Sequence, residues 1–327
     1  MMSDEAIGAA QRLRHPIRVV ARRTGISRHV LRAWERRYGV VAPGRTGGGQ
    51  RVYSDADIER LKLLRQLVEA GWPISRAAEL SEAELVQLAA EAVPARDGGS
   101  PGSAVAQAGG ASGDGAAYVD SCLEAAARAD YEVVRRVLVR AVVSLRPGDL
   151  LEQVIGPLLT EVGERWHRGE LRAAQEHAVS VAVRSVLAFL LSAYEAELEA
   201  PLLVATTLEG DLHEFGALLA SLVAAEAGWR VLYLGPSLPV DEIVDAAVAG
   251  GAAAVALSVV DGIGEAELVR ELGRLRAGLP AAVRVLVGGR MAAAHRAAVA
   301  RLEGVEPADL ELLRRTLPRF TGGEVLA

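Results

Sequence analysis

The sequence predicts a multidomain protein with a mostly helical N-terminal part, a helical bundle, and a C-terminal α/β domain containing a doubly wound parallel sheet. Three observations predict this order. Apolar residues recur at helical spacing through most of the first two hundred residues. A Gly-, Ser- and Pro-rich stretch interrupts them. From residue 201, short apolar runs alternate with helical patterns. The expected divisions are 13–93, a flexible linker at 94–116, 117–197 and 200–320.

Composition restricts the class of protein. The chain has 327 residues, enough for two or three domains with sizeable cores. Its single cysteine, Cys122, excludes a disulfide framework and a cysteine-rich metal site. The first residues do not form a signal peptide, and charges or glycines interrupt the apolar stretches before they reach a membrane span. We therefore expect a cytoplasmic protein that does not enter a membrane.

The charges are distributed unevenly along the chain. Residues 1–76 carry 15 Lys+Arg and 7 Asp+Glu, a net charge of +8. The remaining residues carry 21 basic and 35 acidic side chains, a net charge of −14, which gives −6 for the whole chain. A basic N-terminal part attached to an acidic remainder indicates that the N-terminal part contacts a polyanion. The alternative is that its basic residues form an ordinary solvated helical surface.

Two helices joined by a tight turn are expected in the basic part. The first runs through residues 15–23, and Thr24-Gly25-Ile26 forms the turn. Ser27 is a good N-cap for the second helix, which extends to Tyr38 and ends at Gly39. The apolar stripe of this second helix leaves its arginines largely on the other side. A basic second helix after a glycine-containing turn is typical of the helix-turn-helix arrangement.

A glycine-rich hairpin with interleaved Arg and Tyr follows over residues 43–54, and further helices are expected at 58–69, from residue 74, and at 82–91. With its Trp-Glu-Arg-Arg-Tyr-Gly segment and Arg-x-Tyr-Ser ending, this region resembles the winged helix-turn-helix domain of the MerR family. The resemblance implies dimers or larger homo-oligomers on double-stranded operator DNA. It places six residues at the DNA: Arg28, Arg32, Arg36, Arg45, Arg51 and Tyr53. MerR activators have a long dimerisation helix at this position, whereas this chain has only the short helix at 82–91, which argues against dimerisation through it.

Four helices are expected in the bundle, at 117–129, 131–145, 149–167 and 170–194. Trp166 stands eleven residues before His177, about three helical turns. The glycine at 169 favours a helix end that presents Trp166, followed by a helix that presents Glu176 and His177. The alternatives are a core tryptophan and a surface histidine.

Strands are expected at 202–206, 230–234, 253–258 and 284–287, with a weak fifth near Val305, and helices at 214–227, 240–249, 265–278 and 291–302. Parallel strands end at one edge of the sheet, where α/β proteins bind ligands. The loops at that edge contain Asp211, His213 and Gly216 after the first strand, Ser258 and Val260 after the third, and Gly288 and Gly289 after the fourth. A plain turn at the two glycines and a strand-end cap at Ser258 are the alternatives.

This Asp-x-His-x-x-Gly loop, with its serine and Gly-Gly, resembles the cobalamin-binding domain of methionine synthase and the cobalamin mutases. The resemblance implies that His213 ligates cobalt from below. Asp211 then fixes the imidazole tautomer, Ser258 bonds the nucleotide tail, and the two glycines let that tail pass. Asp211 stands where light-sensing repressors usually have Glu, and Val260 replaces the Leu commonly found two residues after the serine; both changes are conservative.

Trp166, Glu176 and His177 together resemble the helical cap of the light-sensing MerR regulators of the CarH/LitR type. The implied function is a repressor that binds adenosylcobalamin in the dark, assembles as a dimer or tetramer on DNA, and releases DNA after light breaks the cobalt–carbon bond. Trp166 and Glu176 would pack against the adenosyl group, and His177 would become the upper ligand after light. We do not expect an enzyme.

Three alternatives stay open at this point. One is a MerR regulator that senses cobalamin without light. Another uses a bilin or a different tetrapyrrole in place of, or beside, cobalamin. The third is a corrinoid methyl carrier, which has no reason to contain a MerR domain or Glu176-His177.

Overall fold

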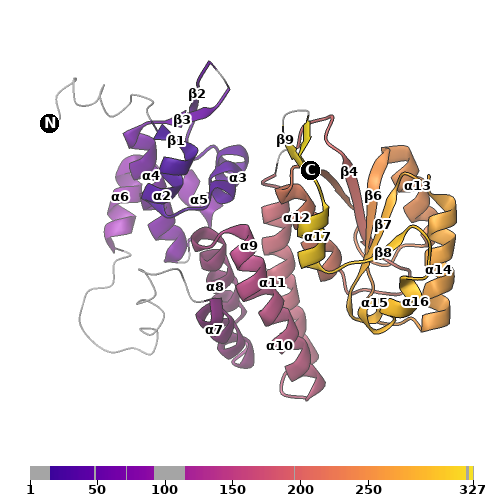
Figure 1. The fold of residues 1–327 in the computed structure, drawn as a ribbon. Helices are drawn as coiled ribbons and strands as arrows, with labels where there is room; N and C mark the ends of the chain where they lie inside the picture. Colours follow the sequence, from indigo (N-terminus) through magenta and orange to yellow (C-terminus); the bar gives the residue numbers. More distant parts are fainter. Residues whose placement is uncertain are drawn as a thin grey trace. The chain divides into compact units, whose positions relative to one another are not determined.

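The structure is a computed structural model that describes residues 15–47, 49–70, 72–91, 115–194, 196–321 and 324–326. It divides into two compact units, one ending at Ala193 and the other beginning at Tyr194 (Figure 1). The predicted linker at 94–116 lies outside the described residues except for its last two. Gly115 and Ala116 belong instead to the first helix of the bundle.

The N-terminal part of the first unit has the winged helix-turn-helix fold that the sequence predicts. Ser27 accepts a hydrogen bond from the backbone N–H of Val30, and Gly25 and Gly39 end the two helices with positive φ angles of 71° and 59°. Trp34 is 2% exposed and lies in the core. A short first strand, which was not predicted, pairs with the second strand of the wing. The elements are β1 (His15–Pro16), α2 (Ile17–Thr24), α3 (Arg28–Tyr38), β2 (Gly44–Arg45), β3 (Arg51–Tyr53), α4 (Asp55–Glu69), α5 (Ile74–Ala78) and α6 (Glu82–Glu91).

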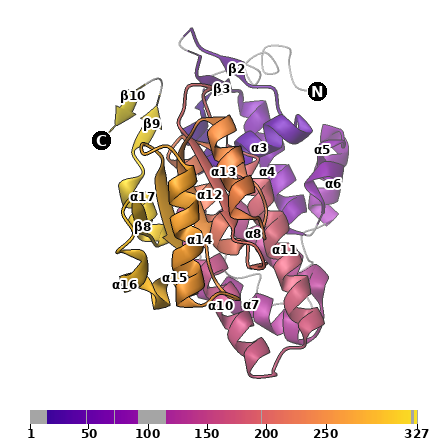
Figure 2. The ribbon, with the colours of Figure 1, turned by 90° about the vertical axis from the view of Figure 1, so that its right-hand side faces the viewer.

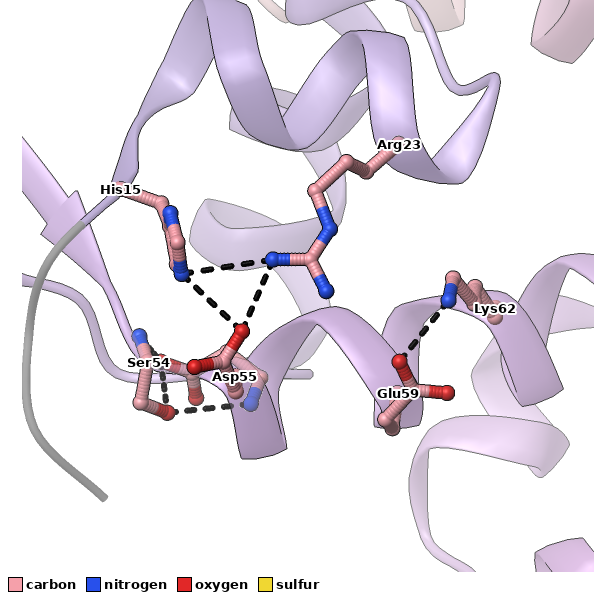
Figure 3. Close-up of polar contacts among 7 residues, drawn as sticks. His15, Arg23, Ser54, Asp55, Glu59 and Lys62 are labelled. Carbon is pink, nitrogen blue, oxygen red and sulfur yellow. Dashed lines mark hydrogen bonds and ion pairs between the residues drawn. The ribbon is translucent and has the colours of Figure 1, made fainter. Parts of the chain in front are cut away.

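Polar contacts around the start of α4 connect three elements (Figure 3). Ser54 and Asp57 form a capping box, in which each side chain accepts a hydrogen bond from the other residue's backbone N–H. Asp55 accepts a hydrogen bond from Arg23 of α2 at 2.8 Å and lies 3.0 Å from the ring of His15 in β1. Because these side chains are about a third exposed, the ion pair contributes less than about 1 kcal/mol, and the capping box is the main determinant of where α4 begins.

A buried carboxylate joins the wing to α3. Glu35 accepts hydrogen bonds from the Tyr53 hydroxyl and from Nε of Arg51, the latter at 3.1 Å. Burial raises the pKa of Glu35, and the two donors oppose that rise. Tyr53 therefore differs from the expectation of a side chain presented to DNA. It is fully buried, with its hydroxyl bonded to Glu35, while Arg51 stays partly exposed.

The bundle of the first unit contains the four predicted helical segments, the third of them interrupted. A π-helical turn precedes Gly156-Pro157, where the Gly156 N–H bonds to the Leu151 carbonyl, five residues back. Pro157 has no N–H with which to continue a regular ladder there. The elements are α7 (Gly115–Ala127), α8 (Tyr131–Ser144), α9 (Pro147–Leu150), η1 (Leu151–Ile155), α10 (Gly156–His167) and α11 (Ala173–Leu191).

Among the described residues, α11 is long and apolar enough to cross a membrane, which the sequence reading did not anticipate. It packs against α7, α8 and α10. Its first turn is fixed to the end of α7, because the Gln175 side chain donates to the carbonyls of Ala126 and Ala127 at 2.9 and 3.1 Å. We therefore describe α11 as a bundle helix.

The second unit is a five-stranded parallel sheet in the order β5-β4-β6-β7-β8, as in other doubly wound folds. The weak fifth strand is present, the helix expected at 291–302 is divided at His295, and α17 was not predicted. The strands are β4 (Leu202–Thr207), β5 (Arg230–Tyr233), β6 (Ala252–Ser258), β7 (Arg284–Gly288) and β8 (Val305–Pro307), and a separate hairpin is formed by β9 (Arg319–Thr321) and β10 (Glu324–Leu326).

Helices cover both faces of this sheet. One apolar core lies under α12 (Phe215–Glu226) and α17 (Leu310–Thr316). The other lies under α13 (Val240–Gly250), α14 (Glu265–Gly278), α15 (Arg290–Ala294) and α16 (Arg296–Val299). Figure 2 looks onto the face covered by α13 and α14. The chain reverses its winding direction between β4 and β6, so the ligand crevice of such a fold is expected at the carboxyl ends of these two strands.

We predict that Tyr53→Phe loosens the wing. The substitution removes a hydroxyl donor from the buried Glu35 carboxylate, which costs about 1–3 kcal/mol. Hydrogen exchange of the full-length protein should become faster in α3 and β3 and stay unchanged in the second unit. Tyr131→Phe, at a more exposed position, is the matched control. Exchange equal in the two variants would contradict the role given to Tyr53.

Candidate functional site

His213 lies in the loop that follows β4, at the switch point of the sheet. Its Nδ1 is 2.9 Å from Oδ1 of Asp211, which also accepts the His213 backbone N–H at 2.9 Å. The Asp211 side chain is 3% exposed, whereas that of His213 is 55% exposed. A proton held on Nδ1 by the carboxylate leaves Nε2 with a free lone pair, the form in which imidazole ligates a metal.

The second oxygen of Asp211 connects this loop to the neighbouring strand. Oδ2 accepts the backbone N–H groups of Val260 at 2.6 Å and Asp261 at 3.3 Å, both in the loop after β6. Val260 therefore contributes to the site through its backbone. One buried carboxylate orients the imidazole and joins the two loops that flank the crevice.

Further hydrogen bonds hold the histidine loop from the β5 side. The Ser237 backbone N–H donates to Oγ1 of Thr207 at 2.7 Å, and Oγ1 of Thr207 donates to the Asp211 carbonyl at 2.5 Å. Oγ of Ser237 accepts the Gly210 N–H at 3.0 Å. Ser237 has a φ of 62°, a conformation that costs a non-glycine residue free energy and persists where surrounding contacts require it.

The sequence reading did not assign roles to Thr207, Ser237, Glu214 or Tyr233. Glu214, next to His213, is buried and accepts a hydrogen bond from the Tyr233 hydroxyl of β5. A polar residue at the end of a buried strand is a sequence signal that would have pointed to Thr207. The contacts across β4 and β5, however, depend on the strand order, which spacing alone does not reveal.

A pocket opens at the carboxyl ends of β6 and β7, and it brings together Gly216, Ser258, Gly288 and Gly289 from the predicted set. Glycine is required at three of these positions. A Cβ on Gly216 would lie 2.2 Å from the Ser258 hydroxyl, and one on Gly288 would lie 2.7 Å from the Ala308 carbonyl. Gly289 has a φ of 96°, and its Cβ would meet the Val259 carbonyl at 2.3 Å. The lining residues are Gly216, Ala220, Ala256, Leu257, Ser258, Leu286, Gly288, Gly289, Ala308, Asp309, Leu310 and Leu313.

The Ser258 hydroxyl is buried in this pocket without a hydrogen-bond partner. Burial of a hydroxyl without a partner is unfavourable, so such a group is suited to a ligand atom. The pocket has glycine at its mouth, apolar walls and one unpartnered hydroxyl, and it opens at the same sheet edge as His213. These residues fit a cobalamin whose lower ligand is a histidine and whose nucleotide tail enters the protein.

The bundle presents a second carboxylate–histidine pair. Nδ1 of His177 lies 2.6 Å from Oε2 of Glu176, and the other oxygen of Glu176 accepts the Ser180 hydroxyl at 2.6 Å. The His177 side chain is 77% exposed. Trp166, near the end of α10, is 46% exposed and makes an edge contact with the ring of His167. Trp166 is thus an exposed side chain, and it lies on a different helix from the Glu176–His177 pair, as the glycine at 169 favoured.

The predicted DNA-contacting arginines form a basic surface on the winged domain. Arg28, Arg32 and Arg36 are exposed along α3, and Arg45 is exposed on β2. Arg51 is half-buried against Glu35. A recognition helix and a wing with exposed arginines match the geometry by which winged helix-turn-helix domains contact the phosphates and bases of duplex DNA.

Family models match three segments of the chain. Residues 16–84 match the MerR HTH family regulatory protein, residues 118–191 match a B12 binding domain of one type, and residues 201–310 match a B12 binding domain of another. In fold, the chain resembles the monomethylamine corrinoid protein of Methanosarcina barkeri, with a TM-score of 0.50 and 16% identity over 61% of this chain and 96% of that one.

Two curated relatives match along most of the chain. The HTH-type transcriptional repressor CarH of Myxococcus xanthus is 37% identical over 290 residues, which cover 88% of this chain and 92% of CarH. The HTH-type transcriptional repressor CarA of the same organism is 31% identical over 86% of this chain and 89% of CarA. The chain therefore belongs to the CarH family of MerR-type transcriptional regulators and combines a DNA-binding domain with cobalamin-binding domains.

Proposed function

We propose that this regulator is a light-responsive transcriptional repressor, which binds adenosylcobalamin in the dark, oligomerises on operator DNA, and releases the DNA when light breaks the cobalt–carbon bond. The observation that carries the proposal is the carboxylate-oriented His213 beside a glycine-bordered pocket with an unpartnered Ser258 hydroxyl. In this proposal, 13–93 binds DNA, 94–116 is the tether, 117–197 is the cap, and 200–320 holds the corrinoid. The protein acts in the cytoplasm, without a membrane partner and without catalysis.

In the second unit, Nε2 of His213 would hold the cobalt of a bound corrinoid. Asp211 retains the proton on Nδ1, so the imidazole stays neutral at the metal-binding nitrogen. Ser258 donates to or accepts from the nucleotide tail, and Gly288 and Gly289 leave room for it. When bound, the corrinoid supplies a cobalt–carbon bond that visible light can break.

In the first unit, Trp166 and Glu176 contribute the surface that meets the adenosyl group, and Trp166 offers an exposed aromatic face for it. His177 is already oriented by Glu176 with Nε2 free, so it is suited to ligate cobalt once the upper position is vacated. A change in which of these side chains is engaged would couple loss of the adenosyl group to a change in oligomeric state.

The proposal is tested by size measurement in the dark and in light. The purified full-length protein, loaded with adenosylcobalamin, should elute as a dimer or tetramer in the dark and as a smaller species after green light, with a changed absorption spectrum. Complete photolysis without a change of size would leave cobalamin sensing without a light response. Failure to take up adenosylcobalamin at all would exclude the cobalamin mechanism and favour another tetrapyrrole.

Substitutions of the two histidines should affect different states of the protein, the dark state for His213 and the illuminated state for His177. His213→Ala should weaken dark binding of adenosylcobalamin by about tenfold or more, since a metal–imidazole bond with its carboxylate partner is lost. His177→Ala should leave the dark spectrum unchanged and alter the illuminated one. His295→Ala is the matched control, because its imidazole also contacts a carboxylate, that of Glu265, at 3.0 Å. An illuminated spectrum of His177→Ala identical to the parent would remove His177 from the mechanism.

DNA binding should depend on the arginines of α3. Arg32→Ala and Arg36→Ala should each weaken binding to duplex DNA and reduce the slope of log affinity against log salt by about 1, the effect of losing one phosphate contact. Fluorescence anisotropy at several salt concentrations measures both quantities. Arg128→Ala, at an exposed arginine of the bundle, should leave the slope unchanged. Equal slopes in all variants would show that α3 does not face the phosphates.

A further inference from the structure

We propose that Gln175 is a positioning residue for the Glu176–His177 pair, and that it acts through Glu176 on the preference for adenosylcobalamin over a cobalamin with a small upper group. This inference rests on the proposed function, in which Glu176 meets the adenosyl group. It adds the residue that holds this part of the bundle in place.

The pair lies in a part of α11 that is not anchored in the apolar core. Glu176 and His177 are the fourth and fifth residues of the helix, within about one and a half turns of its start. Residues 172–174 are exposed, and the first buried residue of α11 is Val179. Helix ends fray where tertiary packing does not hold them. The orientation of the pair therefore depends on the polar contacts of this first turn.

The hydrogen bonds of the pair itself stay within α11. One oxygen of Glu176 lies 2.6 Å from Nδ1 of His177, and the other accepts the Ser180 hydroxyl at 2.6 Å. These contacts orient the two side chains relative to the axis of their own helix. They do not fix the start of that helix to the rest of the bundle.

Gln175 makes that connection, because its half-buried side chain bridges the start of α11 and the end of α7. Its Nε2 donates to the carbonyls of Ala126 and Ala127 at 2.9 and 3.1 Å. Its Oε1 accepts the backbone N–H of Arg172 at 2.8 Å. The last carbonyls and the first N–H groups of a helix have no partner within that helix, so one amide satisfies groups at both helix ends.

The end of α7 requires an uncharged donor at this position. Backbone N–H groups of residues 128–130 bond to three of the last four carbonyls of α7, and the fourth, that of Ala127, accepts the Gln175 amide. The carbonyl end of a helix carries partial negative charge, which repels a carboxylate. Gln175→Glu therefore keeps the shape of the side chain but replaces the attraction to α7 with repulsion.

The first measurement is hydrogen exchange of the full-length protein without corrinoid. Gln175→Met keeps the length of the side chain and removes its three hydrogen bonds. The amides of residues 177–180, which follow the first turn, should exchange about fivefold faster, the effect of losing one net hydrogen bond. Gln153→Met, at an exposed glutamine of the same bundle, is the matched control and should leave exchange unchanged. Unchanged exchange in Gln175→Met would overturn the inference.

The second measurement titrates the full-length protein in the dark with adenosylcobalamin and, separately, with methylcobalamin, followed by absorbance. The two ligands share the corrin ring and the nucleotide tail, so contacts with those parts cancel in the ratio of affinities. Gln175→Met and Gln175→Glu should each lower the affinity for adenosylcobalamin relative to methylcobalamin by about fivefold, because a methyl group cannot make the contacts of an adenosyl group. Equal losses for both ligands would assign Gln175 a purely structural role and defeat the inference.

A double variant determines whether Gln175 acts through its neighbour. Glu176→Ala alone should lower the ratio by at least as much as Gln175→Met. The variant that carries both substitutions should lower it no further than Glu176→Ala, since a positioning residue has no effect once the group that it positions is removed. Additive losses would show that Gln175 does not act through Glu176.

The outcomes separate this inference from the proposed function. If neither cobalamin binds the parent protein, the cobalamin mechanism itself fails, and the inference fails with it. If Glu176→Ala leaves the ratio unchanged, the role proposed for Glu176 is wrong, and so is the inference. If Glu176→Ala lowers the ratio and the Gln175 variants do not, the proposed role of Glu176 stands and only the positioning by Gln175 is wrong.

Discussion

The second unit depends on how one buried carboxylate is satisfied. Asp211 is almost inaccessible to water, and a carboxylate in that position must be surrounded by donors. It has four of them: the imidazole and backbone N–H of His213, and the N–H groups of Val260 and Asp261. Because the donors come from two loops, the carboxylate both orients the imidazole and joins the loops that follow β4 and β6.

The two histidines assigned to cobalt have the same local design on unrelated elements. Nδ1 of His213 contacts the carboxylate of Asp211 in a loop that follows a strand, and Nδ1 of His177 contacts the carboxylate of Glu176 in the first turns of a helix. The settings differ in their solvent exposure. Asp211 is buried and accepts hydrogen bonds from backbone N–H groups of two loops. Glu176 is partly exposed and accepts a hydrogen bond from Ser180, and its histidine side chain is 77% exposed, against 55% for His213. The difference agrees with the proposal that His213 is a permanent cobalt ligand and His177 an occasional one.

Much of this was predictable from sequence, for identifiable reasons. Alternating apolar runs gave the sheet and its helices to within a few residues, because strand and helix periods differ strongly over residues 202–288. The capping residue Ser27 located the start of the second helix. The prediction that Tyr53 contacts DNA was wrong. A motif shows which residues occur together, but it does not show that one of them will be hydrogen-bonded to the buried Glu35. The hydrogen bond between Thr207 and Ser237 depends on the order of the strands in the sheet. The position of α17 depends on the path of the chain after β8. Local sequence patterns encode neither.

The contribution of α17 to the pocket has a consequence for where the corrinoid domain ends. Leu310 and Leu313 form one side of the pocket, although they follow the last strand of the sheet. A fragment that ends after β8 would keep the five strands, the histidine loop and Ser258. Without α17, however, its Ser258 hydroxyl would be exposed to water. If the corrinoid binds as proposed, the module that holds it therefore extends beyond the sheet to include α17.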